Sequence, residues 1–236
     1  MSTLWIESFP EEALKAALPG RGGLPSRGVA VASANPDILL QVRRREVNLA
    51  VWNRDLPDSL STAALRRFMR AAPFSVVAEG PPAKVAGMLL DRLPRPAPPD
   101  LMLDVFDLAM VFAALDGDAP AVRARLEALT HDGCTRWHAD AVGLRLLCTY
   151  RGGGTEWLPL DGGAAAARAI GRDAAPRCAT QIPTGAVAIL KGEAYRDPRG
   201  QANAGGGCIH RSPPAGRGRR ARLLLCIDQI RWNLPT

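Results

Sequence analysis

The chain has 236 residues, which is enough for one domain with a sizeable hydrophobic core. Hydrophobic residues make up 47% and charged residues 22%, as in ordinary globular proteins, so composition argues against a disordered or fibrous chain. The formal net charge is +7, but arginine is spread along the chain and aromatic residues make up only 5%. This leaves too few aromatic side chains for a platform that stacks bases, and we do not expect nucleic acid as a partner.

The cysteines and the N-terminus indicate the compartment. Five cysteines without tandem CxxC pairs do not form the pattern of a disulfide framework, which favours a reducing compartment. Residues 1–12 carry Glu7, Glu11 and Glu12 and no apolar stretch of a secretory signal. No apolar run reaches transmembrane length. We therefore expect a cytoplasmic protein with no membrane partner.

The first part of the chain alternates short strands and helices. We predict strands at 47–52 and 74–78, and helices at 59–70, 83–93 and 101–115. The proline-rich run at 94–99 can belong to neither a helix interior nor a central strand, so it is the best candidate boundary. Residues 1–99 are thus predicted to form a helical and strand-containing support region, and residues 100–236 the core, both within one integrated domain.

The second part of the chain is rich in short apolar segments separated by Gly/Pro-rich turns. We predict strands at 122–129, where a short helix is an alternative, and at 144–150, 155–159, 186–190 and 222–228. Long irregular connections are expected at 161–181 and 195–207. This pattern is typical of a β-barrel or jelly roll, so the expected fold class is α+β with a jelly-roll core in the C-terminal half.

Two of the three histidines and one aspartate form a candidate metal site. His138 and Asp140 stand at i and i+2, so in an extended segment their side chains point to the same face. His210 comes much later, before the last predicted strand. Two histidines and one carboxylate can bind Fe(II) on one side and leave the opposite positions open for a co-substrate and O2. The sequence therefore predicts that His138, Asp140 and His210 bind one metal ion.

Zn(II) is the alternative metal at this site. Cys134 precedes His138 by four residues and Cys208 precedes His210 by two, so one or both thiols could complete a closed tetrahedral zinc site. Cys208 shares the parity of His210, which would place it further along the same face. On this alternative the protein is a non-enzymatic zinc-binding or metal-homeostasis protein. A third hypothesis is that the protein is a cupin-like hydrolase or isomerase that uses the metal as a Lewis acid.

The order of motifs resembles Fe(II)/2-oxoglutarate-dependent oxygenases of the prolyl-hydroxylase-like branch. The ordered features are His-x-Asp, a strand ending in a tyrosine, a Pro-x-Gly strand at 183–190, the distal histidine and an arginine that opens the last strand. The resemblance covers roughly residues 130–228 and implies a double-stranded β-helix. It also implies 2-oxoglutarate as co-substrate, bound by Arg222 with help from Tyr150, and catalysis by His138, Asp140 and His210.

This match departs from the family pattern around the arginine. Arg222 lies twelve residues after His210, whereas about ten is usual, so Arg219 and Arg220 fit the spacing better but precede the apolar strand. The family's serine two residues after the arginine is replaced by Leu224. The implied activity is hydroxylase-type oxidation of a C–H bond in a small-molecule or peptidyl substrate that the sequence does not identify.

A second resemblance covers most of the chain. It is similar to an uncharacterised bacterial family known as domain of unknown function eighteen-twenty-six, through the segments 138–142, 147–152, 155–159, 190–193 and 210–214. This resemblance implies no particular activity.

Overall fold

A computed structural model describes residues 4–5, 29–60, 62–117, 119–131, 133–170, 176–197, 199–214 and 221–230. The helices and 3₁₀ turns are η1 (Pro36–Arg43), η2 (Asp58–Leu60), α2 (Thr62–Phe68), η3 (Met69–Ala71), α3 (Pro82–Leu90), α4 (Pro99–Leu115) and α5 (Gly163–Ile170). The strands are β1 (Leu4–Trp5), β2 (Val29–Ser33), β3 (Val47–Trp52), β4 (Phe74–Gly80), β5 (Val122–Leu129), β6 (Leu144–Arg151), β7 (Glu156–Leu158), β8 (Thr180–Gln181), β9 (Val187–Lys191), β10 (Ile209–Arg211) and β11 (Arg222–Gln229).

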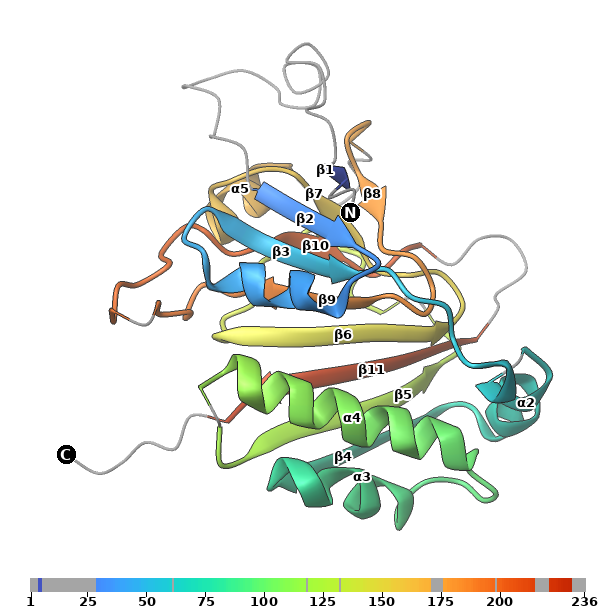
Figure 1. Ribbon diagram of the computed structural model, residues 1–236. Helices are drawn as coiled ribbons and strands as arrows, with labels where there is room; N and C mark the ends of the chain where they lie inside the picture. The colour runs from blue at the N-terminus through green and yellow to red at the C-terminus, as the bar shows by residue number, and fades with distance from the viewer. Residues whose placement is uncertain are drawn as a thin grey trace.

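A large β-sheet is the central element of the fold (Figure 1). Its strand order is β1-β2-β3-β9-β6-β11-β5-β4, and all neighbours are antiparallel except β2 and β3. Strands from the first 99 residues therefore pair directly with strands of the C-terminal half: β3 with β9, and β4 with β5. The fold class is α+β, as predicted, and the arrangement is consistent with a jelly roll.

A smaller sheet has the order β10-β7-β8. An isolated antiparallel bridge between His138 and His210 continues it on the β10 side. Helix α5 packs on this sheet, where Ala167 and Ile170 join the buried cluster that contains Leu158 and Ile209. The chain therefore brings His138, which lies outside the named strands, to the edge of the smaller sheet.

The two faces of the large sheet are buried against different partners. On one face, α3 and α4 cover its lower strands (Figure 1), and Val105 and Phe112 of α4 pack in one cluster with Leu126, Leu146 and Leu225 of β5, β6 and β11. On each of these strands, every second side chain points to this face, as the geometry of a β-strand requires. The apolar stripe of α4 recurs at helical spacing, which explains why it lies flat on the sheet.

The opposite face of the large sheet is turned toward the smaller sheet. Leu147 of β6 and Leu224 and Cys226 of β11 form a second buried cluster with Trp157 of β7 and with Cys208. Strands β6, β9 and β11 are buried on both faces, so they appear in the sequence as continuous apolar runs. Cys208 brings the segment that precedes β10 into this interior layer.

Most predicted elements are confirmed, with two corrections. The expected helix at 59–70 is instead the succession η2, α2 and η3, which fits the frequency of 3₁₀ turns at helix ends. The connection at 161–181, expected to be irregular, contains α5. Segment 122–129 is a strand, as the first of the two alternatives predicted.

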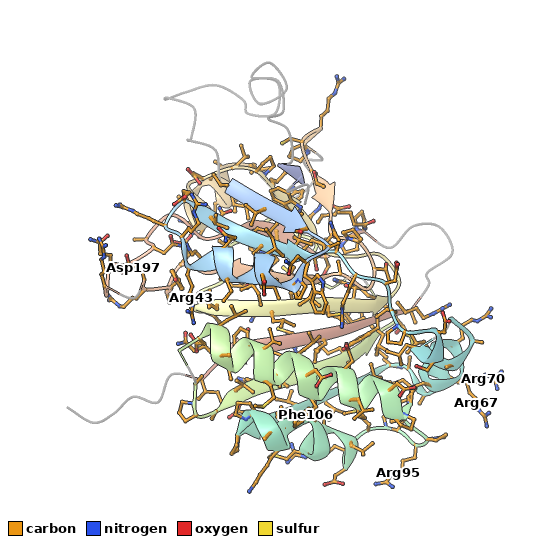
Figure 2. All side chains as sticks on the ribbon, viewed as in Figure 1. Arg43, Arg67, Arg70, Arg95, Phe106 and Asp197 are labelled. Atoms are coloured by element: carbon orange, nitrogen blue, oxygen red, sulfur yellow. The ribbon has the colours of Figure 1, made fainter. Side chains whose placement is uncertain are left out.

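The surface carries both apolar and basic side chains. Figure 2 shows Phe106 on the outer side of α4, where Leu103 and Met110 are also exposed. Of the arginines labelled in the same view, Arg43 lies at the left of the molecule, whereas Arg67, Arg70 and Arg95 lie at the lower right. No helix among the described residues is long and apolar enough to cross a membrane.

Candidate metal centre

His138 and His210 are brought together by their own backbones. The amide of His138 donates to the carbonyl of His210 at 3.0 Å, and the amide of His210 donates to the carbonyl of His138 at 2.9 Å. Residues directly opposite each other in such a pair project their side chains to the same face. The two imidazole rings accordingly lie with centroids 4.4 Å apart.

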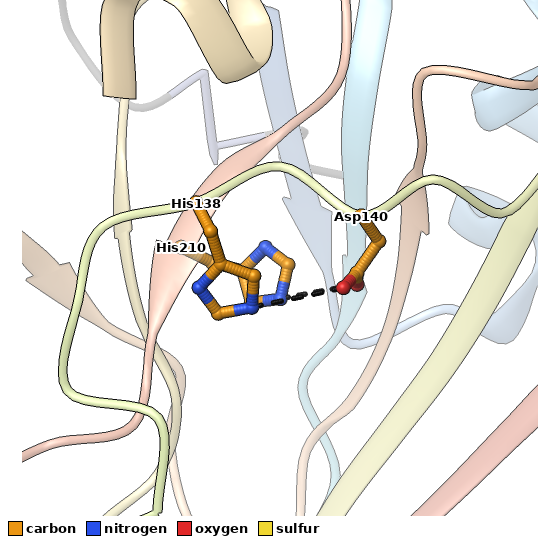
Figure 3. Close-up of side chains that lie close together, drawn as sticks. All are labelled: His138, Asp140 and His210. Carbon is orange, nitrogen blue, oxygen red and sulfur yellow. Dashed lines mark ion pairs between the residues drawn. The ribbon is translucent and has the colours of Figure 1, made fainter. Parts of the chain in front are cut away.

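Asp140 completes the cluster from the same extended segment as His138 (Figure 3). Its Oδ1 lies 3.6 Å from His138 Nε2, and its Oδ2 lies 3.2 Å from His210 Nε2. One donor atom from each of the three residues can be chosen so that all lie within 4.8 Å of one another. Two ligands bound at about 2.1 Å to one ion at a right angle are about 3 Å apart, so these distances fit a shared ion.

Both imidazoles are oriented by hydrogen bonds on their far nitrogens. His138 Nδ1 lies 2.9 Å from the carbonyl oxygen of Arg136, and His210 Nδ1 lies 3.0 Å from that of Cys208. A carbonyl can only accept, so each Nδ1 carries a proton, and in the neutral form of such an imidazole the lone pair on Nε2 is available to an ion. This second contact is typical of metal-binding histidines, whose other ring nitrogen donates to a carbonyl or carboxylate.

The protonation state of the cluster also suits a cation. Burial, followed by the neighbouring His210, lowers the pKa of His138 to about 4, so its imidazole is neutral at pH 7. Burial would raise the pKa of Asp140, but His210 and Arg145 outweigh it and hold this pKa well below its usual range. The cluster therefore offers two imidazoles, that of His138 in its neutral form, and one carboxylate, which is the donor set of a two-histidine, one-carboxylate iron site.

The carboxylate of Asp140 has an unused acceptor. Its Oδ2 is buried and accepts no hydrogen bond of good geometry, although Arg145 Nη1 lies 2.7 Å away in an ion pair. A buried oxygen in this state costs free energy unless something else engages its lone pairs. A metal ion between Asp140 and the two Nε2 atoms would supply that partner, so the residues present fit the predicted metal.

The side chain of Arg222 lines the same cavity as the two histidines. The cavity has a volume of about 450 Å³, and its walls include His138, His210, Arg145 and Arg222. Arg222 is only 7% exposed, and burial lowers the pKa of its guanidinium to about 10. Among the described residues no carboxylate forms an ion pair with Arg222, and its Nε has no hydrogen-bond partner. The cavity thus contains a largely buried cation that forms no ion pair among the described residues.

Three hydroxyl groups surround Arg222. Its Nη2 donates to Thr155 Oγ1 at 2.7 Å and to Thr149 Oγ1 at 3.2 Å, and its Nη1 donates to Ser212 Oγ at 3.2 Å. Sequence reasoning missed these residues, since it looked for one serine at position 224. The position of Ser212, two residues after His210, was the only available signal, because it predicts a side chain on the same face as His210.

Tyr150 is not part of this site, contrary to the expectation from the resemblance. Its side chain lies on the face of β6 that packs under α4, and its hydroxyl donates to Asp104 Oδ2 at 2.6 Å. Asp104 also binds Arg54 through both carboxylate oxygens. The physical reason is strand parity: Tyr150 shares the face of Leu146 and Cys148, whereas the cavity receives the other face of β6.

The cysteine ligands of the zinc alternative are not brought to the cluster. Cys134 Sγ lies 3.7 Å from Nδ1 of His138, on the side of the ring that faces away from Asp140. Cys208 is buried in the apolar layer between the sheets. Among the described residues, the only group of three or more possible ligands is His138, Asp140 and His210. Arg219 and Arg220, the alternatives to Arg222, lie outside the described residues.

The fold and site together define an α+β protein with facing sheets and a possible His-Asp-His metal site. The chain belongs to the family described as "Protein of unknown function (DUF1826)", whose sequence pattern matches residues 33–228. A comparison with curated proteins gives no match.

Several solved structures match most of the chain at low sequence identity. They include the dioxygenase for auxin oxidation 1 from Arabidopsis thaliana in complex with 2-oxoglutarate, which has 12% sequence identity, a TM-score of 0.44 and coverage of 88% of this chain and 92% of that one. A protein assigned as an oxygenase from Shewanella oneidensis has 13% identity, a TM-score of 0.45 and coverage of 86% and 89%. A protein assigned to the 2OG-Fe(II) oxygenase family from Caulobacter crescentus has 15% identity, a TM-score of 0.40 and coverage of 87% of both chains.

Proposed function

We propose that the protein is an Fe(II)- and 2-oxoglutarate-dependent oxygenase that oxidises a C–H bond of a small-molecule or peptidyl substrate. The observation that carries the proposal is the placement of Arg222. A buried guanidinium that forms no ion pair among the described residues shares one cavity with His138 and His210, the two histidines that cluster with Asp140. A metal site alone would not require such a group, whereas a dicarboxylate co-substrate would.

The path of the chain supports a double-stranded β-helix around this cavity. From β5 onward the chain alternates between the two sheets: β5 is in the large sheet, the His138 bridge in the small one, and β6 in the large one again. Strands β7 and β8 return to the small sheet, β9 to the large, β10 to the small and β11 to the large. This winding through two facing sheets is what the resemblance to the oxygenases implies.

His138, Asp140 and His210 would hold the iron through Nε2, a carboxylate oxygen and Nε2. When bound, Fe(II) with 2-oxoglutarate supplies the activation of O2 and the oxidising power for C–H cleavage. The protein's part is to turn both imidazoles inward through the carbonyls of Arg136 and Cys208, to keep His138 neutral and to keep Asp140 ionised.

Arg222 would bind the distal carboxylate of 2-oxoglutarate. A guanidinium can bind a carboxylate through two parallel hydrogen bonds, and such charge-assisted bonds are stronger in a desolvated site. The hydroxyls of Thr149, Thr155 and Ser212 hold the guanidinium in place before the anion arrives. An incoming carboxylate would also give this cation a direct ion pair, in addition to the electrostatic influence of Glu127 in the cavity wall, and so offset the cost of its burial.

The test is anaerobic reconstitution with Fe(II) and 2-oxoglutarate. We expect a weak visible charge-transfer band that appears only when both are present. Arg222→Ala should lose the band at 2-oxoglutarate concentrations that saturate the wild type. Arg123→Ala, which removes the same charge from the exposed side of β5, should keep it. Absence of the band from the wild type, or wild-type affinity for 2-oxoglutarate in Arg222→Ala, would refute the co-substrate assignment.

A further inference from the structure

Arg145 occupies a special position beside the candidate metal ligands. It lies near the start of β6, directly opposite Asp228 of β11 in the antiparallel register. Arg145 lines the cavity, and Asp228 shares the strand face of Leu224 and Cys226, which is turned toward the smaller sheet. Arg145 Nε donates to Asp228 Oδ1 at 2.6 Å, and its Nη2 donates to Asp228 Oδ2 at 2.8 Å. These two parallel bonds fix the plane of the guanidinium.

The remaining nitrogen of the same guanidinium faces the candidate metal ligand. Arg145 Nη1 lies 2.7 Å from Asp140 Oδ2, and the three side chains are only 13–17% exposed. Arginine can contact two carboxylates with opposite edges of one rigid group, whereas a lysine ammonium is a single point charge on a flexible stem. Arg145 therefore connects β11 to the carboxylate of Asp140 through one fixed cation.

The charges of this cluster are balanced for a metal ion. An arginine close to a divalent cation would repel it unless its charge were compensated. Asp228 provides that compensation and leaves the Asp140 carboxylate for the ion. The backbone of Asp140 is held independently, because the amide of Glu193 donates to its carbonyl oxygen at 2.7 Å. Arg145 additionally controls the orientation of the Asp140 side chain.

We propose that Arg145, held by Asp228, is a positioning residue for the metal site: it keeps the Asp140 carboxylate turned toward the two Nε2 atoms. The inference rests on the proposed function only in that His138, Asp140 and His210 bind a metal. It does not depend on 2-oxoglutarate or on turnover. Removing the anchor should therefore change metal binding itself, as loss of an outer-shell partner does in other metal sites.

The experiment uses the full-length protein and Co(II) alone, with affinity measured by competition with a chelator and the ligand field followed by visible absorption. Arg145→Lys keeps the positive charge and removes the pair of parallel hydrogen bonds to Asp228. Asp228→Asn keeps Arg145 and removes the negative charge that compensates it. We expect each variant to bind Co(II) about 10-fold more weakly, with altered d–d bands. Arg54→Lys is the matched control, because Arg54 forms a similar fork with Asp104 on the other face of the sheet. It should lower the melting temperature and leave Co(II) binding unchanged.

The outcomes separate this proposal from the metal assignment. If wild-type protein binds Co(II) and His210→Ala does not, the triad is the metal site. Wild-type affinity and spectrum in both Arg145→Lys and Asp228→Asn would then overturn the positioning role and leave the triad intact. If Co(II) does not bind the wild type, or binds His210→Ala equally well, the metal assignment itself fails. Should Arg145→Lys not fold, Asp228→Asn decides, since it leaves the guanidinium in place.

Discussion

His138 and His210 exchange both of their backbone hydrogen bonds, although they lie far apart in the chain. This bridge means that the two imidazoles are placed by the fold before any ion binds. A site built on paired backbone is more exact than one built on two independent loops, because moving one histidine requires breaking hydrogen bonds to the other. Asp140 lies in the same segment as His138, so the positions of all three candidate ligands depend on this one bridge.

Metal binding should therefore stabilise the folded protein measurably. A ligand at about 100 times its dissociation constant adds about 2.7 kcal/mol, which for a chain of this size raises the melting temperature by roughly 5–10 °C. We expect this increase on anaerobic addition of Fe(II), and its reversal by a chelator. His138→Ala should melt at the same temperature with and without Fe(II). An equal increase in that variant would place the metal elsewhere.

The hydroxyl of Thr155 should contribute to 2-oxoglutarate binding. It accepts a 2.7 Å hydrogen bond from Arg222, so Thr155→Val leaves a buried guanidinium N–H without this partner and frees the group to move. A hydrogen bond to a charged group contributes about 1.5–3 kcal/mol, so we expect a loss of roughly 10-fold or more in 2-oxoglutarate affinity by calorimetry. Thr155→Ser keeps the hydroxyl and should restore most of it. Equal weakening in both variants would show that the methyl group, and not the hydroxyl, matters.

Tyr150 should matter for stability and not for the co-substrate. Tyr150→Phe removes the donor to Asp104 Oδ2 and leaves a buried carboxylate with one partner fewer. The expected cost is about 1–3 kcal/mol in the free energy of unfolding, measured by urea denaturation. The affinity for 2-oxoglutarate should stay within error of the wild type, because the ring lies on the opposite face of β6 from the cavity. A large drop in affinity with unchanged stability would restore the role that the resemblance implies.

The contrast between Tyr150 and Arg222 shows what could be predicted from sequence. His138 and Asp140 at i and i+2, and the strand starting at Arg222, follow from local spacing alone. Local spacing does not predict which face of β6 is turned toward the cavity. Both faces of this strand are buried, and the alternation of Arg145, Leu147 and Thr149 with apolar residues does not distinguish a polar face from an apolar one.

Contacts between distant segments were beyond sequence reasoning for a different reason. Arg145 meets Asp228 only through the register of β6 against β11, which joins segments far apart in the chain. At the other end of the same pairing, next to Arg222, the register shifts at an irregularity between Leu223 and Leu224. A shift of one residue exchanges the faces of a strand, so no spacing rule can be carried across it. The hydroxyls around Arg222 likewise come from three separate segments, which only the complete fold brings together.

Gly192 should be required for the position of Asp140. A Cβ at Gly192 would lie 2.1 Å from the carbonyl oxygen of Val142 and 2.8 Å from that of Asp140, both of them backbone atoms. Gly192→Ala must therefore displace the segment that carries the ligand, and overpacking of this kind costs about 1–3 kcal/mol in stability. We expect lower stability together with weaker Co(II) binding, measured by denaturation and by chelator competition. Gly87→Ala is the control, since nothing lies within 4 Å of a Cβ there and alanine favours its helix. If Gly192→Ala bound Co(II) like the wild type, the backbone of Asp140 would tolerate displacement, and the side-chain contact with Arg145 would have to suffice for its placement.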